Sequence, residues 1–128
     1  VTNLMVAIKS KEEWKDPNEV KVVIDNGNNA LYFSRESIPS KKKYTGSIKA
    51  YKQVCVIPFK RDMLLQYTML DPTPLEEIES VDMNRLLEHG YKVKMVKTTY
   101  QTFAVDTVVD LENVQKKMIG DSLIKDYS

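Results

Sequence analysis

The chain has 128 residues, of which 42% are hydrophobic and 29% are charged, and its formal net charge is +1. This length and composition are typical of a globular protein with one core, so we expect a single domain over residues 1–128. The near-zero charge argues against a nucleic-acid binder. No apolar run approaches the roughly 20 residues that cross a bilayer, so we expect no membrane partner.

The single cysteine, Cys55, excludes a disulfide framework within the chain and fits a cytoplasmic protein. It lies in the apolar run 54–57, which predicts a small buried side chain rather than a nucleophile. The run of three lysines at 41–43 predicts a solvated loop. Because the sequence starts at Val1 inside a strand-like run, we expect a piece of a longer protein or a lost tag or initiator.

The first half of the sequence predicts four strands, because β-branched and apolar residues alternate or cluster there. We place them at residues 4–8, 20–25, 30–34 and 53–59. The last of these is apolar on both faces, which is typical of a buried central strand. Ser10 and Glu13 form a capping-box pattern for one helical turn, Asn26-Gly27 predicts a hairpin, and residues 40–51 are expected to form a loop.

The second half predicts three helices and one strand. Apolar residues at helical spacing indicate a helix over 61–70. A second helix is expected to start after Thr73, which is followed by proline, and to stop at Gly90. Residues 91–98 alternate as a strand does, and Thr107 is placed to cap a final helix. The order β-(α)-β-β-β-α-α-β-α predicts an α/β fold, a mixed sheet with flanking helices.

The residues alone indicate little chemistry, since neither a glycine-rich phosphate loop nor a zinc pattern is present. His89 is most simply a cation at a helix end. Glu76 and Glu79 share one helix face, either as a site or as helix-end electrostatics. Asp106 lies at a strand-to-helix junction, where it serves either a metal or ligand site or a turn.

Five segments follow one another in a fixed order along nearly the whole chain. They are D-P-N-E-V-K-V-V-I-D at 16–25, A-L-Y-F-S-R with I-P at 30–39, P-T-P-L-E at 72–76, Glu79 with Arg85, and V-D-T with D-L-E at 105–112. Together they resemble the carboxyl-terminal half of the 3-deoxy-manno-octulosonate cytidylyltransferases, or CMP-Kdo synthetases. Enzymes of this family activate Kdo, an eight-carbon acidic sugar, with CTP and release pyrophosphate.

The resemblance implies a fold like the carboxyl half of a nucleotide-diphospho-sugar transferase. It also implies that the chain contributes the acidic-sugar site and the dimer surface, most simply as a homodimer. Asp106 takes the place of a family aspartate that holds Mg²⁺. The residues implied to bind the sugar are Arg35, Gln53, Glu76, Glu79 and Arg85. Of these, Arg35 and Arg85 are implied to serve the acidic sugar or its surroundings, and Glu76 to contact sugar hydroxyls.

The sequence also departs from the family pattern. Neither the nucleotide loop, R-x-x-S-x-R-x-P-G-K, nor the second metal motif, Q-G-D-E-P, is present. A separate nucleotide-binding half would then be needed to bind CTP, to complete the Mg²⁺ site and to make the protein catalytically active. Gln53 replaces a family histidine and Ile57 a tyrosine. These changes keep open an alternative, a non-catalytic dimeric binding or scaffold protein descended from the family.

Overall fold

The computed structural model describes residues 1–100, 102–103 and 105–126. Within these residues five strands form one mixed sheet in the order β3-β2-β4-β1-β5. The strands are β1 (Thr2–Ala7), β2 (Lys21–Ile24), β3 (Ala30–Ser34), β4 (Tyr51–Val54) and β5 (Lys94–Lys97). The helices are α1 (Lys11–Lys15), α2 (Arg61–Tyr67), α3 (Pro74–Glu79), α4 (Met83–Glu88), α5 (Val108–Met118) and the short η1 (Ile124–Asp126). The predicted α/β class, a mixed sheet with flanking helices, is confirmed.

The sheet is antiparallel except at one edge. β4 pairs antiparallel with both β1 and β2, β2 pairs antiparallel with β3, and β5 pairs parallel with β1. The predicted hairpin between β2 and β3 is confirmed. Its turn is held by Asp25, whose carboxylate accepts the backbone N–H of Asn29 at 2.7 Å, while Asn28 adopts a left-handed φ of 58°.

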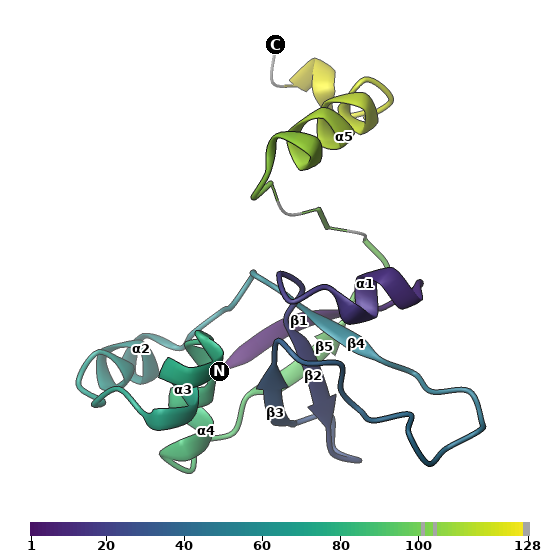
Figure 1. Cartoon of the computed structure of the whole chain (residues 1–128). Helices are drawn as coiled ribbons and strands as arrows, with labels where there is room; N and C mark the ends of the chain where they lie inside the picture. Colours follow the sequence, from purple (N-terminus) through teal and green to yellow (C-terminus); the bar gives the residue numbers. More distant parts are fainter. Residues whose placement is uncertain (101, 104, 127–128) are drawn as a thin grey trace.

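The core lies between the sheet and the short helices. Its buried side chains come from four strands, from α4 and from the loops beside α4: Met5, Val22, Ala30, Phe33, Val81, Met83, Leu86, Val93 and Met95. Asn84 on α4 fixes the helix to the edge strand β3, because its side chain accepts the N–H of Phe33 and donates to the carbonyl of Phe33. Figure 1 shows α2, α3 and α4 gathered beside the sheet, whereas α5 stands away from it.

Several predicted elements differ in extent from the structure: the helix predicted over 61–70 ends at Tyr67, and the strand predicted over 91–98 covers Lys94–Lys97. Two differences are larger. The single helix expected from Thr73 to His89 is two helices, α3 and α4, because Ser80 adopts left-handed angles (φ 53°, ψ 52°) that end α3. The end predicted at Gly90 is confirmed by its φ of +80°. The strand predicted at 53–59 is assigned only over Tyr51–Val54. After it, the carbonyls of Val56 and Pro58 still accept the backbone N–H groups of Leu4 and Thr2 at 3.3 and 3.1 Å, so the pairing with β1 continues in an irregular form.

Cys55 is exposed, so the expectation of a buried cysteine is also wrong. The chain bends at this residue directly after β4 ends, which turns its side chain out of the sheet. No helix in the described part of the chain is both long enough and apolar enough to cross a bilayer.

Candidate functional site

Three hollows are neighbours, because they share lining residues. The first, of about 610 Å³, lies between the loop after α1 and the start of α5. It shares Asn18, Glu19 and Phe103 with a second hollow of about 280 Å³. The second shares Val20, Gln53 and Cys55 with a third, of about 300 Å³. We call the combined surface the furrow.

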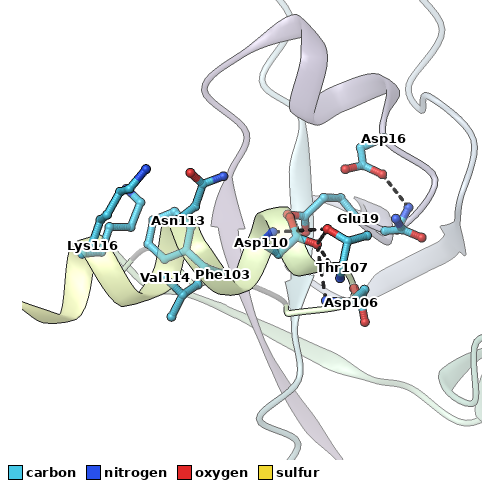
Figure 2. Close-up of a pocket in the computed structure, with 11 residues that line it drawn as sticks. Asp16, Glu19, Phe103, Asp106, Thr107, Asp110, Asn113, Val114 and Lys116 are labelled. Carbon is cyan, nitrogen blue, oxygen red and sulfur yellow. Dashed lines mark hydrogen bonds between the residues drawn. The ribbon is translucent and has the colours of Figure 1, made fainter.

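The end of the furrow at α5 is organised by a helix cap (Figure 2). The backbone N–H and the hydroxyl of Thr107 donate to the carboxylate of Asp110 at 2.9 and 2.7 Å, and the N–H of Asp110 donates back to Thr107 Oγ1 at 3.2 Å. The hydrogen bonds from Thr107 lower the pKa of the Asp110 carboxyl. The cap predicted at Thr107 is confirmed, and it leaves the neighbouring Asp106 exposed at the mouth of the hollow.

Four carboxylates line this end of the furrow, those of Asp16, Glu19, Asp106 and Asp110. Among the residues that the structure describes, however, no three metal-binding side chains come together as a metal site would require. The Asp110 carboxylate is already engaged in the cap. Mg²⁺ usually takes one or two carboxylates together with water and phosphate oxygens. The described residues do not form a magnesium site by themselves, and the metal role implied for Asp106 stays a prediction.

The opposite end of the furrow is built around Arg35, which follows β3. Its guanidinium donates from Nε to the carbonyl of Glu79 at 2.7 Å, from Nη1 to Pro17 at 2.9 Å and from Nη2 to Ser80 at 3.0 Å. Three backbone carbonyls thus hold the arginine rigidly in the furrow wall. Gln53 on β4 is half-buried, and its side-chain amide makes no hydrogen bond with the described residues.

Behind this wall, Glu79 joins α3 to β3. Its carboxylate accepts hydrogen bonds from the hydroxyls of Tyr32 and Ser34, both at 2.8 Å, and from the N–H of Arg35 at 2.9 Å. Burial alone would raise the pKa of the Glu79 carboxyl, but these three donors together lower it. Burial and the hydrogen bond to Glu79 raise the pKa of Tyr32 to about 12.

Glu76 and Arg85 form a second internal pair, between α3 and α4. The guanidinium donates through Nη2 and Nε to the two carboxylate oxygens at 2.6 and 2.7 Å, and the Glu76 residue is only 8% exposed. Arg85 also lies over the ring of Tyr67, 5.0 Å from its centroid. The hydrogen bonds from Arg85 lower the pKa of Glu76. This bidentate geometry is the arrangement in which arginine binds a carboxylate most tightly.

Comparison with known proteins identifies the family to which this chain is similar. The family model described as Cytidylyltransferase matches residues 1–98, more than half of the chain. The chain belongs to the cytidylyltransferase family. The 3-deoxy-manno-octulosonate cytidylyltransferase of Fusobacterium nucleatum is 47% identical over 105 residues, covering 82% of this chain and 42% of the relative. The enzyme of the same name from Geobacter metallireducens is 38% identical over 121 residues, covering 87% of this chain and 48% of the relative.

A solved structure agrees with this assignment. It is described as CMP:2-keto-3-deoxy-manno-octonic acid synthetase complexed with CTP, it is 31% identical, and it superposes with a TM-score of 0.82 over 92% of this chain and 48% of its own. The resemblance to CMP-Kdo synthetases and the nucleotide-sugar transferase type of fold are both confirmed. The chain spans about half the length of the relatives it matches.

Within this cytidylyltransferase fold the predicted site residues separate into two groups. Arg35, Gln53 and Asp106 line the furrow. Glu76, Glu79 and Arg85 lie instead in hydrogen-bonded contacts where β3, α3 and α4 meet. Their roles toward a ligand stay predictions.

The furrow residues that were not predicted as site residues include Glu19, Cys55 and Asp82. Glu19 lies inside the D-P-N-E-V segment that matches the family, and this segment is the one signal that pointed to it. Cys55 and Asp82 carry no such signal.

Proposed function

We propose that this chain supplies the acidic-sugar site and the dimer surface of a cytidylyltransferase. The reaction is CTP plus a Kdo-like sugar giving the CMP-sugar and pyrophosphate, and the CTP-binding half lies outside this chain. The observation that carries the proposal is the 47% identity over 105 residues to a 3-deoxy-manno-octulosonate cytidylyltransferase, of which the chain covers 42%. The absence of a nucleotide loop from this sequence supports the division into halves.

Attack of a sugar hydroxyl on the α-phosphorus of CTP needs positioning and stabilisation of charge more than a covalent intermediate. In the furrow, the unengaged amide of Gln53 can donate to and accept from sugar hydroxyls. Arginine carries five N–H donors, and Arg35 uses three of them on carbonyls. The remaining two are held in a fixed position where a sugar carboxylate can accept them.

Magnesium is expected to neutralise phosphate charge in this reaction, and Asp106 would give it one carboxylate. Since the described residues do not complete such a site, the remaining ligands would come from the nucleotide and from the other half.

For Glu76, Glu79 and Arg85 we propose positioning roles rather than direct contact with the sugar. Glu79 holds the backbone and side chain of Arg35, through its carboxylate and its carbonyl respectively. The Glu76–Arg85 pair keeps α3 and α4 together beneath that contact. Loss of either pair would displace Arg35 and weaken sugar binding indirectly.

We propose further that the chain forms a homodimer and acts in the cytoplasm. Large apolar side chains on α2, just after α2 and on α3 support a docking surface there: Leu65 is 52% exposed, Met69 82% and Ile78 78%. Exposed apolar groups of this size are typical of faces that another protein covers.

The test combines binding and complementation. Kdo, CTP and Mg²⁺ are titrated calorimetrically into the chain, singly and together, and the chain is then mixed with the nucleotide-binding half of the Fusobacterium nucleatum relative. We expect Kdo to bind whether or not CTP is present, weaker Kdo binding by Gln53→Ala, and pyrophosphate release only in the mixture. CTP turnover by the chain alone would contradict the division into halves. Absence of both sugar binding and complementation would favour the non-catalytic scaffold.

A further inference from the structure

A fourth hollow, of about 370 Å³, lies between α1 and the long loop that precedes β4. It shares no lining residue with the furrow. We call it the lysine hollow, and its lining residues are Ile8, Lys9, Ser10, Lys11, Trp14, Lys41, Ile48 and Ala50. The cytidylyltransferase reaction proposed above makes no use of it.

The charge of this hollow is of one sign. Three of its eight lining residues are lysines, and none is acidic. None of the ion pairs found among the described residues involves Lys9, Lys11 or Lys41. The loop over residues 37–50 adds further lysines and contains no aspartate or glutamate. In a chain whose net charge is only +1, this is a marked local concentration of positive charge.

Two acidic side chains of α1 are near the hollow in the sequence: Glu12 is exposed and takes part in none of the ion pairs among the described residues, and Glu13 is engaged elsewhere. Glu13 on α1 binds the buried ammonium of Lys52 at 2.8 Å and accepts the backbone N–H of Lys9 at 2.9 Å. Lys52 is also bound by Glu19 at 2.7 Å. The Glu13 carboxylate is therefore directed toward β4, and the lysine ammonium groups at the hollow keep their charge available for a ligand.

One wall of the hollow is a fixed aromatic ring. The indole N–H of Trp14 donates to the carbonyl of Ile38 at 3.0 Å, and the hydroxyl of Ser37 donates to the carbonyl of Trp14 at 3.1 Å. The ammonium of Lys41 lies 5.4 Å from the centre of the ring. Two isoleucines and an alanine complete an apolar lining. The lysines and the apolar wall together suit a ligand that is anionic at one end and apolar at the other.

We propose that the lysine hollow binds an organic phosphate, with the phosphoryl oxygens on Lys9, Lys11 and Lys41 and the apolar part against Trp14 and Ile48. Several ammonium groups around one space match the multiple charges of a polyphosphate better than a single carboxylate. A nucleoside triphosphate and inorganic pyrophosphate both carry this chemistry, and they differ in the apolar part that the wall would contact.

Trp14 is the single tryptophan of the chain, so its fluorescence reports on this hollow alone. The chain is titrated with pyrophosphate, with a nucleoside triphosphate and with the bare nucleoside. Because the base absorbs the exciting light and can lower the fluorescence without binding, the same titrations are repeated by calorimetry. We expect saturable binding of both phosphates, tighter for the triphosphate, and none for the nucleoside. Equal affinity for the two phosphates would overturn the role of the apolar wall, and no saturable binding of either would overturn the site.

Matched variants separate a built site from general attraction to lysines. Loss of one charge-assisted contact should weaken triphosphate binding on the order of tenfold in Lys41→Gln or Lys11→Gln. Lys92→Gln removes an exposed lysine that does not line the hollow, and it should bind as the parent chain does. Equal weakening in all three variants would overturn the proposal. Gln53 lies in the furrow, so Gln53→Ala should weaken sugar binding and leave phosphate binding to the lysine hollow unchanged. The experiment therefore distinguishes an error in this proposal from an error in the proposed sugar site.

Discussion

The contact between β3, α3 and α4 contrasts with helix α5, although both carry segments that resemble the family pattern. At the first, Glu79 and the Glu76–Arg85 pair have their partners within this chain. In α5 no residue is buried, and Val108 and Leu111 are 73% and 45% exposed. Both regions have amphipathic sequences, but only in the first does a helix, α4, pack its apolar side chains against the sheet. The comparison shows that a family segment either packs within this chain and stabilises it, or stays exposed and contributes little to its stability. Mutations that change the free energy of unfolding distinguish the two cases.

The largest difference is expected between two leucines. Leu86 on α4 is fully buried in the core, whereas Leu111 on α5 is exposed. Leu86→Ala should lower the free energy of unfolding by about 3–4 kcal/mol, because it removes buried methyl groups and leaves a cavity. Leu111→Ala should change it by less than about 0.5 kcal/mol. Urea denaturation measures both, and similar losses would show that α5 packs on the sheet in solution.

Glu79 should have the next largest effect. Glu79→Ala leaves the hydroxyls of Tyr32 and Ser34 and the N–H of Arg35 without their acceptor. Since each unsatisfied group costs about 1–3 kcal/mol where it is fully buried, and this site is partly exposed, we expect a loss near 3 kcal/mol. Glu77→Ala on the exposed face of α3 is the control and should be nearly neutral. Equal stability of the two variants would mean that Glu79 does not hold α3 to β3.

A smaller effect should appear in the pH dependence of stability. The pKa of Glu76 is lowered from 4.5, chiefly by Arg85, so near and below that pH the unfolded chain binds more protons than the folded one. The contribution of Glu76 is then fully present above pH 4.5 and is lost as the pH falls through the lower folded pKa. Glu76→Gln should show a shallower acid loss in denaturation curves than the parent chain. Glu77→Gln should match the parent, and an identical slope for Glu76→Gln would contradict the pairing.

The sequence predicted the fold well where the determinants are local. The Asn26-Gly27 hairpin, the caps at Ser10 and Thr107 and the helix end at Gly90 are set by residues a few positions apart, and all are present. The break at Ser80 was missed, because it accompanies a distant contact. The carbonyl of Ser80 accepts from Arg35, 45 residues earlier in the chain.

The candidate site was predictable only in part, for the same reason. Asp106 was singled out because the sequence predicted a strand-to-helix junction there, and Gln53 and Arg35 because family segments pointed to them. The junction was half wrong: the cap at Thr107 follows Asp106, but β5 ends at Lys97 and the described residues between it and Asp106 form no strand. That Glu79 is engaged by Tyr32 and Ser34 depends on how β3 meets α3, which no spacing within either segment reveals. The furrow residue Asp82 likewise reaches the site only through the turn at Ser80.

The smallest effect on stability should come from Asp106, at the open end of the furrow. Its carboxylate makes no hydrogen bond or ion pair with any described residue, so Asp106→Asn should leave the free energy of unfolding within about 0.5 kcal/mol of the parent. Asp110→Asn is the matched control, because it weakens the cap at Thr107 and should reduce the helicity of α5 measured by circular dichroism. If the family role holds, Asp106→Asn should nevertheless abolish pyrophosphate release in the complemented mixture. An aspartate that contributes nothing to stability yet is required for turnover would be one that the fold leaves open for a ligand, whereas a fully active Asp106→Asn mixture would reduce it to a turn residue.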